Sequence, residues 1–443
     1  MIAVLLFAAA IQVPDTVPLT LDAALDRALA RYPTVEAARA RAEGAAADVG
    51  TARAAWLPRL SFDGSLNRFQ EPMVVAPLHG FDPTNPPLFD RTLIQPQVSF
   101  AWTLFDLGRE SRIRAQRALG RAADQAVSST ETRLMAQVVD AYLRVLATRD
   151  ELTAQDQRLA ALTAESQRTM QLLAQGKAAR VDALRVDAEA KRARADRIAS
   201  AAQVDIAEHQ LGQLASEPFE AVHASPLVAL ALADTSLAAD TTATGREPLV
   251  RQALSNSPDI LELEQRVRAA GAGLAAARAA WLPQLRANGA YIDYGSGSWA
   301  FSPQWQVGVT LSYPIFTGGG RVSAIRRAAA DDRAAGEQLR GARLSVEQGV
   351  DQGLAALREA HARVAALQSA VQQSEEVTRI ERLSLEVGSG TETDYLDAEA
   401  RLLSARAGLI QARHAEISAR VELARMTGEL SRGWLAQALE KMP

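Results

Sequence analysis

Two carboxylates near the C-terminal end of the sequence, Asp394 and Asp397, are spaced so that together they could attract cations. Residues three apart on a helix share one face, so both carboxylates would point the same way. A second interpretation stays open. Thr391 and Asp394 fit a capping box, and acidic residues near the start of a helix are favoured by its dipole. The residues alone do not separate a charged binding surface from an ordinary helix N-terminus.

Patterns typical of enzymes are missing from the sequence. There is no cysteine, which excludes thiolate metal sites and cysteine nucleophiles, and the five histidines lack the spacing of metal ligands. His361 falls on an apolar helical stripe, where we expect a packed histidine. The glycine run 318–320 lacks the Lys-Ser/Thr ending of a phosphate-binding loop. We therefore expect no enzyme, no cofactor and no metal site.

Composition narrows the class of protein further. The 443 residues include 48 Lys and Arg against 52 Asp and Glu, a net charge of −4. This near balance argues against a nucleic-acid binder, which carries a basic face. Only 5% of the residues are aromatic and alanine is abundant, which favours closely packed helices over a thick core.

The N-terminus begins with an apolar run at residues 2–10 that ends in alanines. Residues 1–17 are therefore expected to be a signal peptide and leader, although a ragged apolar N-terminus is the alternative. Elsewhere the sequence has no run of about 18 apolar residues, so it encodes no transmembrane helix. A chain of this kind enters a bilayer only with strands.

The sequence contains an internal duplication. The segment 52–60, with its Trp-Leu-Pro motif, recurs 225 positions later at 277–285. A second offset, 212 positions, relates Gly108 to Gly320, Gly176 to Gly388, Asp182 to Asp394 and Leu184 to Leu396. A nearly constant register over both halves indicates two copies of one structural unit.

These copies divide the chain into parts. After the leader, the first repeat is expected at 18–215 and the second at 247–428, joined by a connector at 216–246 and followed by a tail at 429–443. Each repeat is predicted to contain a helix, a pair of strands and two long helices. The long helices are expected at 109–175, 177–215, 321–387 and 389–428, packed side by side as in coiled coils.

The strand pairs are expected at about 60–105 and 285–316, where apolar residues alternate with polar ones. The alternation fits strands with one lipid-facing side, and equally a half-buried hairpin of a soluble protein. The candidate membrane-facing positions are Val98, Phe100, Trp102, Trp305, Val307, Val309, Leu311 and Tyr313. The proline-rich segment 68–97 is expected to be a loop, because proline is unfavourable in a central strand. For Trp56 and Trp281 we expect packing where strands join helices.

Four strands are too few to form a membrane structure alone. Lipid leaves no strand edge unpaired, so membrane strands must close into a barrel. About eight strands leave an interior that side chains fill, whereas three chains would supply twelve strands and an aqueous pore. The strand number therefore favours a homotrimer.

This layout resembles the TolC family of outer-membrane efflux channels. The resemblance rests on the duplicated order of elements, the paired Trp-Leu-Pro motifs, and the segments Phe105–Arg109 and Phe316–Arg321 that leave the second strands. It implies a mainly α-helical homotrimer in the outer membrane, with a 12-stranded β-barrel continued by a long α-helical periplasmic barrel. It also implies docking to a periplasmic adaptor (membrane fusion protein) and an inner-membrane efflux pump or ABC exporter, in drug or metal efflux or type I secretion.

The resemblance also assigns site residues. Asp394 and Asp397 would line the periplasmic aperture. Gly176 with Lys177, and Gly388 with Ser389, would form hairpin tips that face the adaptor, although these glycines can equally be simple helix terminators. The family commonly has Val-Gly-Leu at these tips, and this chain has Gln-Gly-Lys and Val-Gly-Ser. A soluble periplasmic coiled-coil scaffold or adaptor is the alternative function.

Overall fold

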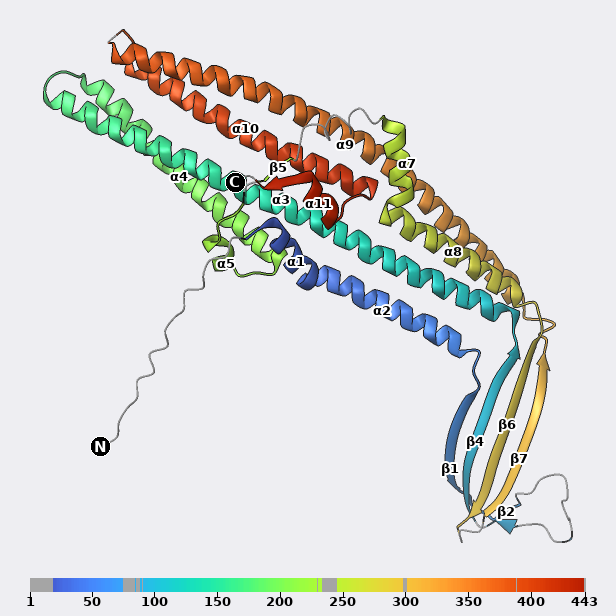
Figure 1. The fold of residues 1–443 in the computed structure, drawn as a ribbon. Coiled ribbons are helices and arrows are strands. Elements are labelled where there is room, and N and C mark those ends of the chain that lie inside the picture. Colours follow the sequence, from blue (N-terminus) through green and yellow to red (C-terminus); the bar gives the residue numbers. More distant parts are fainter. Residues whose placement is uncertain are drawn as a thin grey trace, which may run out of the picture. The chain divides into compact units, whose positions relative to one another are not determined.

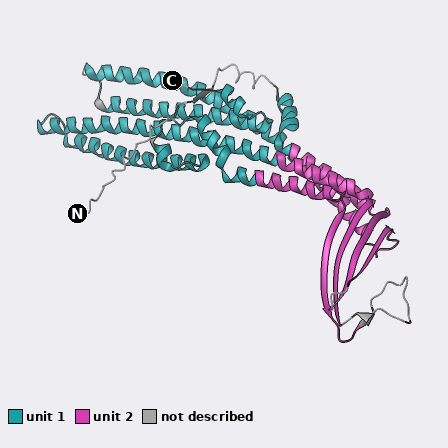
Figure 2. Cartoon of the chain, turned by 60° about the horizontal axis from the view of Figure 1, so that its bottom comes forward, with its two compact units in different colours: residues 1–38, 126–260, 342–443 teal, residues 39–125, 261–341 magenta. Residues whose placement is uncertain are grey.

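The computed structural model describes residues 19–74, 84, 88–89, 91–228, 230–232, 245–297, 301–387 and 389–441. The expected leader at 1–17 lies outside these residues. The chain divides into two compact units (Figure 2). Unit 1 comprises Met1–Ala38, Ala126–Ile260 and Ala342–Pro443, and unit 2 comprises Arg39–Gln125 and Leu261–Gly341.

Apart from the short strands β2 and β3 of the first half, the described helices and strands follow the same order in both halves of the chain (Figure 1). The first half contains α1 (Leu21–Arg31), α2 (Pro33–Ala54), β1 (Arg59–Arg68), β2 (Met73–Val74), β3 (Leu88–Phe89), β4 (Thr92–Phe105), α3 (Leu107–Ala174), α4 (Arg180–Ala215), α5 (Phe219–Ala224) and β5 (Leu230–Leu232). The second half contains α7 (Arg246–Asn256), α8 (Pro258–Ala279), β6 (Gln284–Ser296), β7 (Phe301–Ser312), α9 (Gly320–Glu386), α10 (Glu392–Thr427), α11 (Arg432–Ala438) and β8 (Leu439–Lys441). The predicted mainly helical, duplicated fold is confirmed.

The four long strands form one antiparallel sheet in unit 2, in the order β1-β4-β6-β7. In the described part of the chain, β1 and β7 are therefore edge strands that pair on one side only. Two short pairs, β2 with β3 and β5 with β8, form separate small sheets.

The expected loop at 68–97 was partly wrong, because β4 already begins at Thr92 and includes Pro96. Pro96 is opposite Gly64 of β1, but Gln95 and Pro96 are absent from the register between β4 and β6. Proline has no N–H to donate, and it is tolerated where the ladder is interrupted. The second strand pair also ends earlier than expected, at Ser312 rather than 316, just before Pro314.

The largest core of unit 1 joins both halves of the sequence. Buried side chains from α1, α3, α4 and α10 meet around Tyr142, which is fully buried. The Tyr142 hydroxyl lies 3.1 Å from the carbonyl oxygen of Leu19 and 3.0 Å from that of Val228, and it accepts the Val228 N–H at 2.9 Å. Tyr142 therefore holds the segment before α1 and the segment before β5 against α3.

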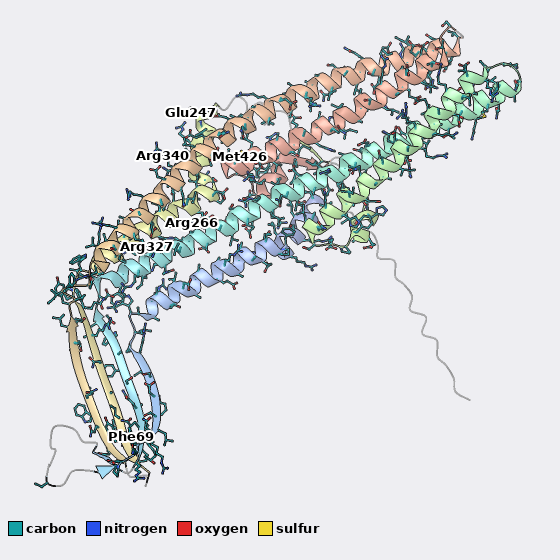
Figure 3. The ribbon with its side chains drawn as sticks, turned by 180° about the vertical axis from the view of Figure 1, so that it is seen from behind. Phe69, Glu247, Arg266, Arg327, Arg340 and Met426 are labelled. Carbon is teal, nitrogen blue, oxygen red and sulfur yellow. The ribbon has the colours of Figure 1, made fainter. Side chains whose placement is uncertain are left out.

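The packing of α9 against α10 depends on small residues. A Cβ atom at Gly349 of α9 would lie 3.2 Å from the sulfur of Met426, which is labelled in Figure 3. A second cluster of buried residues joins these two helices with α7 (Leu249, Val250, Ala253, Val350, Leu354, Leu357 and Leu423). Close helix packing of this kind is what the alanine-rich composition predicted.

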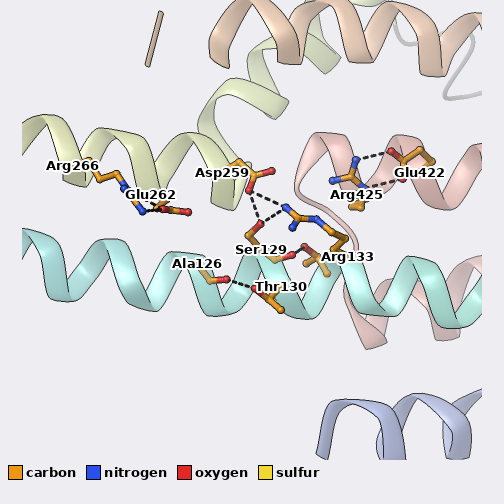
Figure 4. Close-up of polar contacts among 10 residues, drawn as sticks. Ala126, Ser129, Thr130, Arg133, Asp259, Glu262, Arg266, Glu422 and Arg425 are labelled. Carbon is orange, nitrogen blue, oxygen red and sulfur yellow. Dashed lines mark hydrogen bonds and ion pairs between the residues drawn. The ribbon is translucent and has the colours of Figure 1, made fainter. Parts of the chain in front are cut away.

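Polar contacts join α3 to the start of α8 within unit 1 (Figure 4). The Ser129 hydroxyl donates to Asp259 at 2.5 Å, and the Arg133 guanidinium lies 3.2 Å from the Ser129 oxygen and 3.7 Å from Asp259. Asp259 is in the first turn of α8, where an anion is favoured by the helix dipole. Among the described helices, none is both long enough and apolar enough to cross a membrane.

Candidate functional site

One face of the four-stranded sheet is mostly apolar. The register aligns Phe62, Val98, Tyr291 and Trp305 in one row across the four strands. These side chains are not covered, since Phe62 is 72% exposed and Trp305 is 77% exposed. Seven of the predicted membrane-facing residues share this face: Val98, Phe100, Trp102, Trp305, Val307, Val309 and Leu311. The eighth, Tyr313, follows the end of β7 and is half-exposed.

The opposite face of the sheet is polar. The hydroxyl oxygens of Ser61 and Ser99 lie 2.7 Å apart on neighbouring strands, and Thr310 donates to the amide oxygen of Asn288 at 3.1 Å. An exposed apolar face of this extent marks a surface made to be covered, whereas the polar face is suited to water. The sheet is thus built to separate two environments.

The junction of strands and helices carries the same contact twice. The Arg109 guanidinium lies 4.0 Å from the centre of the Trp56 ring, and Arg321 lies 4.2 Å from that of Trp281. Arg109 also donates to the carbonyl oxygen of Ala55 at 3.1 Å, and Arg321 to that of Ala280 at 3.5 Å. Both tryptophans therefore lie at the strand–helix junction, as expected.

A second contact fixes the first of these junctions. The Trp102 indole N–H donates to the carbonyl oxygen of Trp56 at 2.8 Å. This contact ties the end of β4 to the turn that leads into β1. Each repeat thus joins its Trp-Leu-Pro motif to the arginine that follows its second strand. We call this contact the Arg–Trp clamp: Trp56 with Arg109 forms the first, and Trp281 with Arg321 forms the second.

The first predicted tip is a tight helix end. The N–H of Gly176 donates to Leu173 at 2.9 Å and that of Lys177 donates to Leu172 at 2.8 Å, which together form a Schellman motif. Gly176 has φ +72°, a conformation that favours glycine. Gly176 and Lys177 are both exposed and lie between α3 and α4.

The second predicted tip is described in part, since Gly388 lies outside the described residues. Next to it, the N–H of Ser389 donates to the carbonyl oxygen of Ser384 at 2.9 Å, and its hydroxyl donates to the same oxygen at 3.3 Å. Ser389 is exposed. These bonds cap the last turn of α9 before α10 begins.

Asp394 and Asp397 lie in the first turns of α10, and both are exposed. The Thr391 hydroxyl oxygen accepts the Asp394 N–H at 3.2 Å, and this hydroxyl donates to the Asp394 carboxylate at 2.5 Å. Thr391 is therefore the N-cap that the capping-box pattern predicted. This bond does not exclude a second role for Asp394, whose side chain stays in contact with solvent.

Asp397 has different surroundings. It lines a groove of about 240 Å³ between α3, α4 and α10, together with Arg158 and Arg185. Arg185 is the residue 212 positions before Asp397, so the two repeats place opposite charges at equivalent positions. Arg185 is not among the site residues predicted from the sequence, although the offset of the duplication relates it to Asp397.

The expectation that His361 packs on the apolar stripe is wrong. His361 is half-exposed rather than packed, and its Nδ1 lies 2.7 Å from a carboxylate oxygen of Glu416. Leu357 of the same stripe is buried, whereas the His361 side chain reaches Glu416 of α10.

Among the described residues, Asp205, Glu208 and His223 have ligand atoms within 4.8 Å of one another. The buried Glu208 carboxylate already accepts from Arg149 Nε at 2.8 Å, and its other oxygen lies 2.6 Å from His223 Nδ1. Arg149 also donates to the carbonyl oxygen of Ser225 at 3.0 Å. This network joins α3, α4 and α5 through the pairing of a buried charge.

Comparison with known proteins gives one consistent match. A family model described as outer membrane efflux protein matches residues 24–217 and 249–429, which leave out most of the connector and the tail. The chain is 25% identical over 355 residues to outer membrane protein TolC of Vibrio cholerae, with 76% of this chain and 77% of TolC covered. It is also 25% identical over 347 residues to the alkaline protease secretion protein AprF of Pseudomonas aeruginosa, with 75% and 69% covered.

The fold is likewise similar to solved structures. The outer membrane protein VceC of Vibrio cholerae superposes with a TM-score of 0.76 at 18% sequence identity, over 92% of this chain and 96% of VceC. The structural similarity to VceC extends over both repeats. The family that the sequence matches is one of outer membrane efflux proteins and not of enzymes.

Proposed function

Because this chain belongs to the outer membrane efflux protein family, we propose that it forms the passive exit duct of a tripartite efflux or type I secretion system. The observation that carries the proposal is the sheet with two unlike faces. A row such as Phe62, Val98, Tyr291 and Trp305 suits lipid, and the serine and amide groups behind it suit water.

The edges of the sheet support a homotrimer. Because each strand is antiparallel to its neighbour, β7 of one copy would be antiparallel to β1 of the next, so further copies continue the same ladder. Three copies supply twelve strands, enough to enclose a water-filled lumen. Closure also removes both edges, which a bilayer requires.

The periplasmic end of the duct is proposed to lie at the ends of α3, α4, α9 and α10. Threefold symmetry would place three copies of Asp394 and Asp397 around one opening, where a ring of carboxylates attracts cations. The two tips, Gly176 with Lys177 and Gly388 with Ser389, are the surfaces proposed to contact a periplasmic adaptor; of these residues, the structure describes Gly176, Lys177 and Ser389, and all three are exposed. Through the adaptor, the duct would receive cargo from an inner-membrane efflux pump or ABC exporter.

The test is fractionation followed by reconstitution. The protein should enter the outer-membrane fraction, require detergent for extraction and migrate as a heat-sensitive trimer. In planar lipid bilayers, the purified trimer should open water-filled channels. A protein that stays in solution as a single copy without detergent would instead be the soluble scaffold, and the exit-duct proposal would be wrong.

A further inference from the structure

Four arginines gather at the helix-proximal end of the polar sheet face, within unit 2. They line a groove of about 410 Å³ where β1, β4 and β6 meet the start of α3. The arginines are Arg59, Arg109, Arg112 and Arg286, and among the described residues Asp106 alone adds a carboxylate to the groove. The register confirms the side of the sheet, because Arg59 is opposite Ala101 and Arg286 is opposite Thr103, both outside the apolar rows.

The single carboxylate is already engaged. One Asp106 oxygen accepts the N–H of Gly108 at 2.9 Å, and the other forms an ion pair with Arg112. Among the described residues, Arg286 donates only to the neutral amide oxygen of Gln284, at 3.0 Å. Within the described part of the chain, Arg59 has no ion pair. The groove therefore carries more positive charge than its own acidic group can balance.

Arg109 makes the excess of positive charge in the groove energetically unfavourable, because this arginine is buried. Its side chain is 2% exposed, its Nε atom is buried without a hydrogen-bond partner, and no carboxylate among the described residues pairs with it. Its guanidinium lies over the Trp56 ring and donates to the carbonyl oxygen of Ala55, which is a neutral acceptor. A buried cation without a counter-charge is unfavourable, and the N-terminus of the long helix α3 adds further positive potential.

We propose that this groove binds an oxyanion, namely a carboxylate, sulfate or phosphate group. Guanidinium groups match the geometry of such anions with paired hydrogen bonds. The inference rests on the proposed function in one respect, that the polar sheet face lines the conduit. The oxyanion then belongs to cargo in transit or to a lipid headgroup at the ends of the strands, and both sources present the same chemistry.

The test measures binding of inorganic sulfate to the full-length protein by calorimetry. The wild type should bind about one sulfate per chain, and the double variant Arg59→Gln/Arg286→Gln should bind it at least tenfold more weakly. These residues are exposed, so their replacement leaves the Arg–Trp clamp in place. The matched control is Arg327→Gln/Arg340→Gln on α9 (Figure 3), which removes two exposed positive charges outside the groove.

Each outcome decides the proposal. Equal sulfate affinity of the wild type and the Arg59→Gln/Arg286→Gln variant, or an equal loss in the control, would overturn it. Repeating the titration in nanodiscs distinguishes the sources: phosphatidylglycerol should compete with sulfate when the ligand is a headgroup, and should have no effect when the ligand enters from water. Channel formation is scored separately, so a conducting protein without sulfate affinity refutes the oxyanion site alone.

Discussion

Arg109 and Trp56 are 53 residues apart in the sequence, yet the guanidinium carbon of Arg109 lies 4.0 Å from the centre of the Trp56 ring. The second repeat forms the same contact between Arg321 and Trp281 at 4.2 Å. The residues that lead the chain into each strand pair are therefore attached to the residues that lead it out. This pairing gives a physical reason why each repeat contains both a Trp-Leu-Pro motif before its first strand and an arginine after its second strand.

Replacing Arg109 with lysine should weaken the first clamp while preserving its charge. Lysine cannot combine planar stacking on Trp56 with a hydrogen bond to Ala55, and we expect a loss of about 1–2 kcal/mol in the free energy of unfolding. Urea unfolding monitored by tryptophan fluorescence measures this change in the free energy of unfolding. Arg321→Lys is the internal comparison and should cost less, because Arg321 is less buried. Equal stability of Arg109→Lys and wild type would contradict a stabilising clamp.

Removing the acidic pair of α10 should change conduction. We expect Asp394→Ala/Asp397→Ala to raise single-channel conductance and to weaken block by multivalent cations, because a ring of carboxylates would no longer hold them. Planar-bilayer recordings with and without a trivalent cation give the measurement. Thr391→Ala is the control, since it removes the cap of α10 without removing charge. Unchanged conductance and block would rule out an aperture at these residues.

Charge reversal at the first tip should affect docking alone. Lys177 is exposed next to the Schellman turn at Gly176, and its side chain makes no hydrogen bond or ion pair among the described residues. Lys177→Glu is therefore expected to reduce recovery of the adaptor in pull-down experiments and to leave trimer assembly intact. Lys191→Glu, on an exposed face of α4, is the matched control. Equal recovery of the adaptor by both variants would argue against contact at this tip.

Stability at high pH should depend on Tyr142. Burial raises the pKa of Tyr142 to about 12 from its ordinary value of 10. The folded state thus favours the neutral phenol, so the free energy of unfolding is at its full value below pH 10 and falls by about 2 kcal/mol as the pH rises to 12. Tyr142→Phe should lower stability at neutral pH and flatten this decline. Parallel declines in both proteins between pH 10 and 12 would contradict the assignment.

The order of elements could be predicted from the sequence because it depends on local patterns. Alternation of apolar and polar residues marked β4 and β7, and the constant offset of 212 positions aligned the helices that follow. Each of these signals lies within a short stretch of chain or repeats at a fixed distance. Such patterns need no knowledge of which elements are neighbours.

Features that depend on which elements are neighbours in space could not be predicted from the sequence. Pro96 is accommodated in β4 because the ladder with β6 is interrupted there, a property of two strands almost 200 residues apart. His361 reaches Glu416 because α9 packs on α10, and its position on the apolar stripe gave no sign of this contact. The arginine groove combines residues from β1, β4, β6 and α3, so no single motif contains it.

The two edge strands, β1 and β7, are different surfaces, and each would join the other type of edge on an adjacent copy. Each chain in a closed ring would then pair with two neighbours, through β1 on one side and through β7 on the other. A variant with one intact edge and one blocked edge would still be incorporated, and it would stop the ring from closing. Such an allele should be dominant. When the variant is co-produced with normal chains, the fraction of assemblies that fail to close should exceed the fraction of chains that carry the variant.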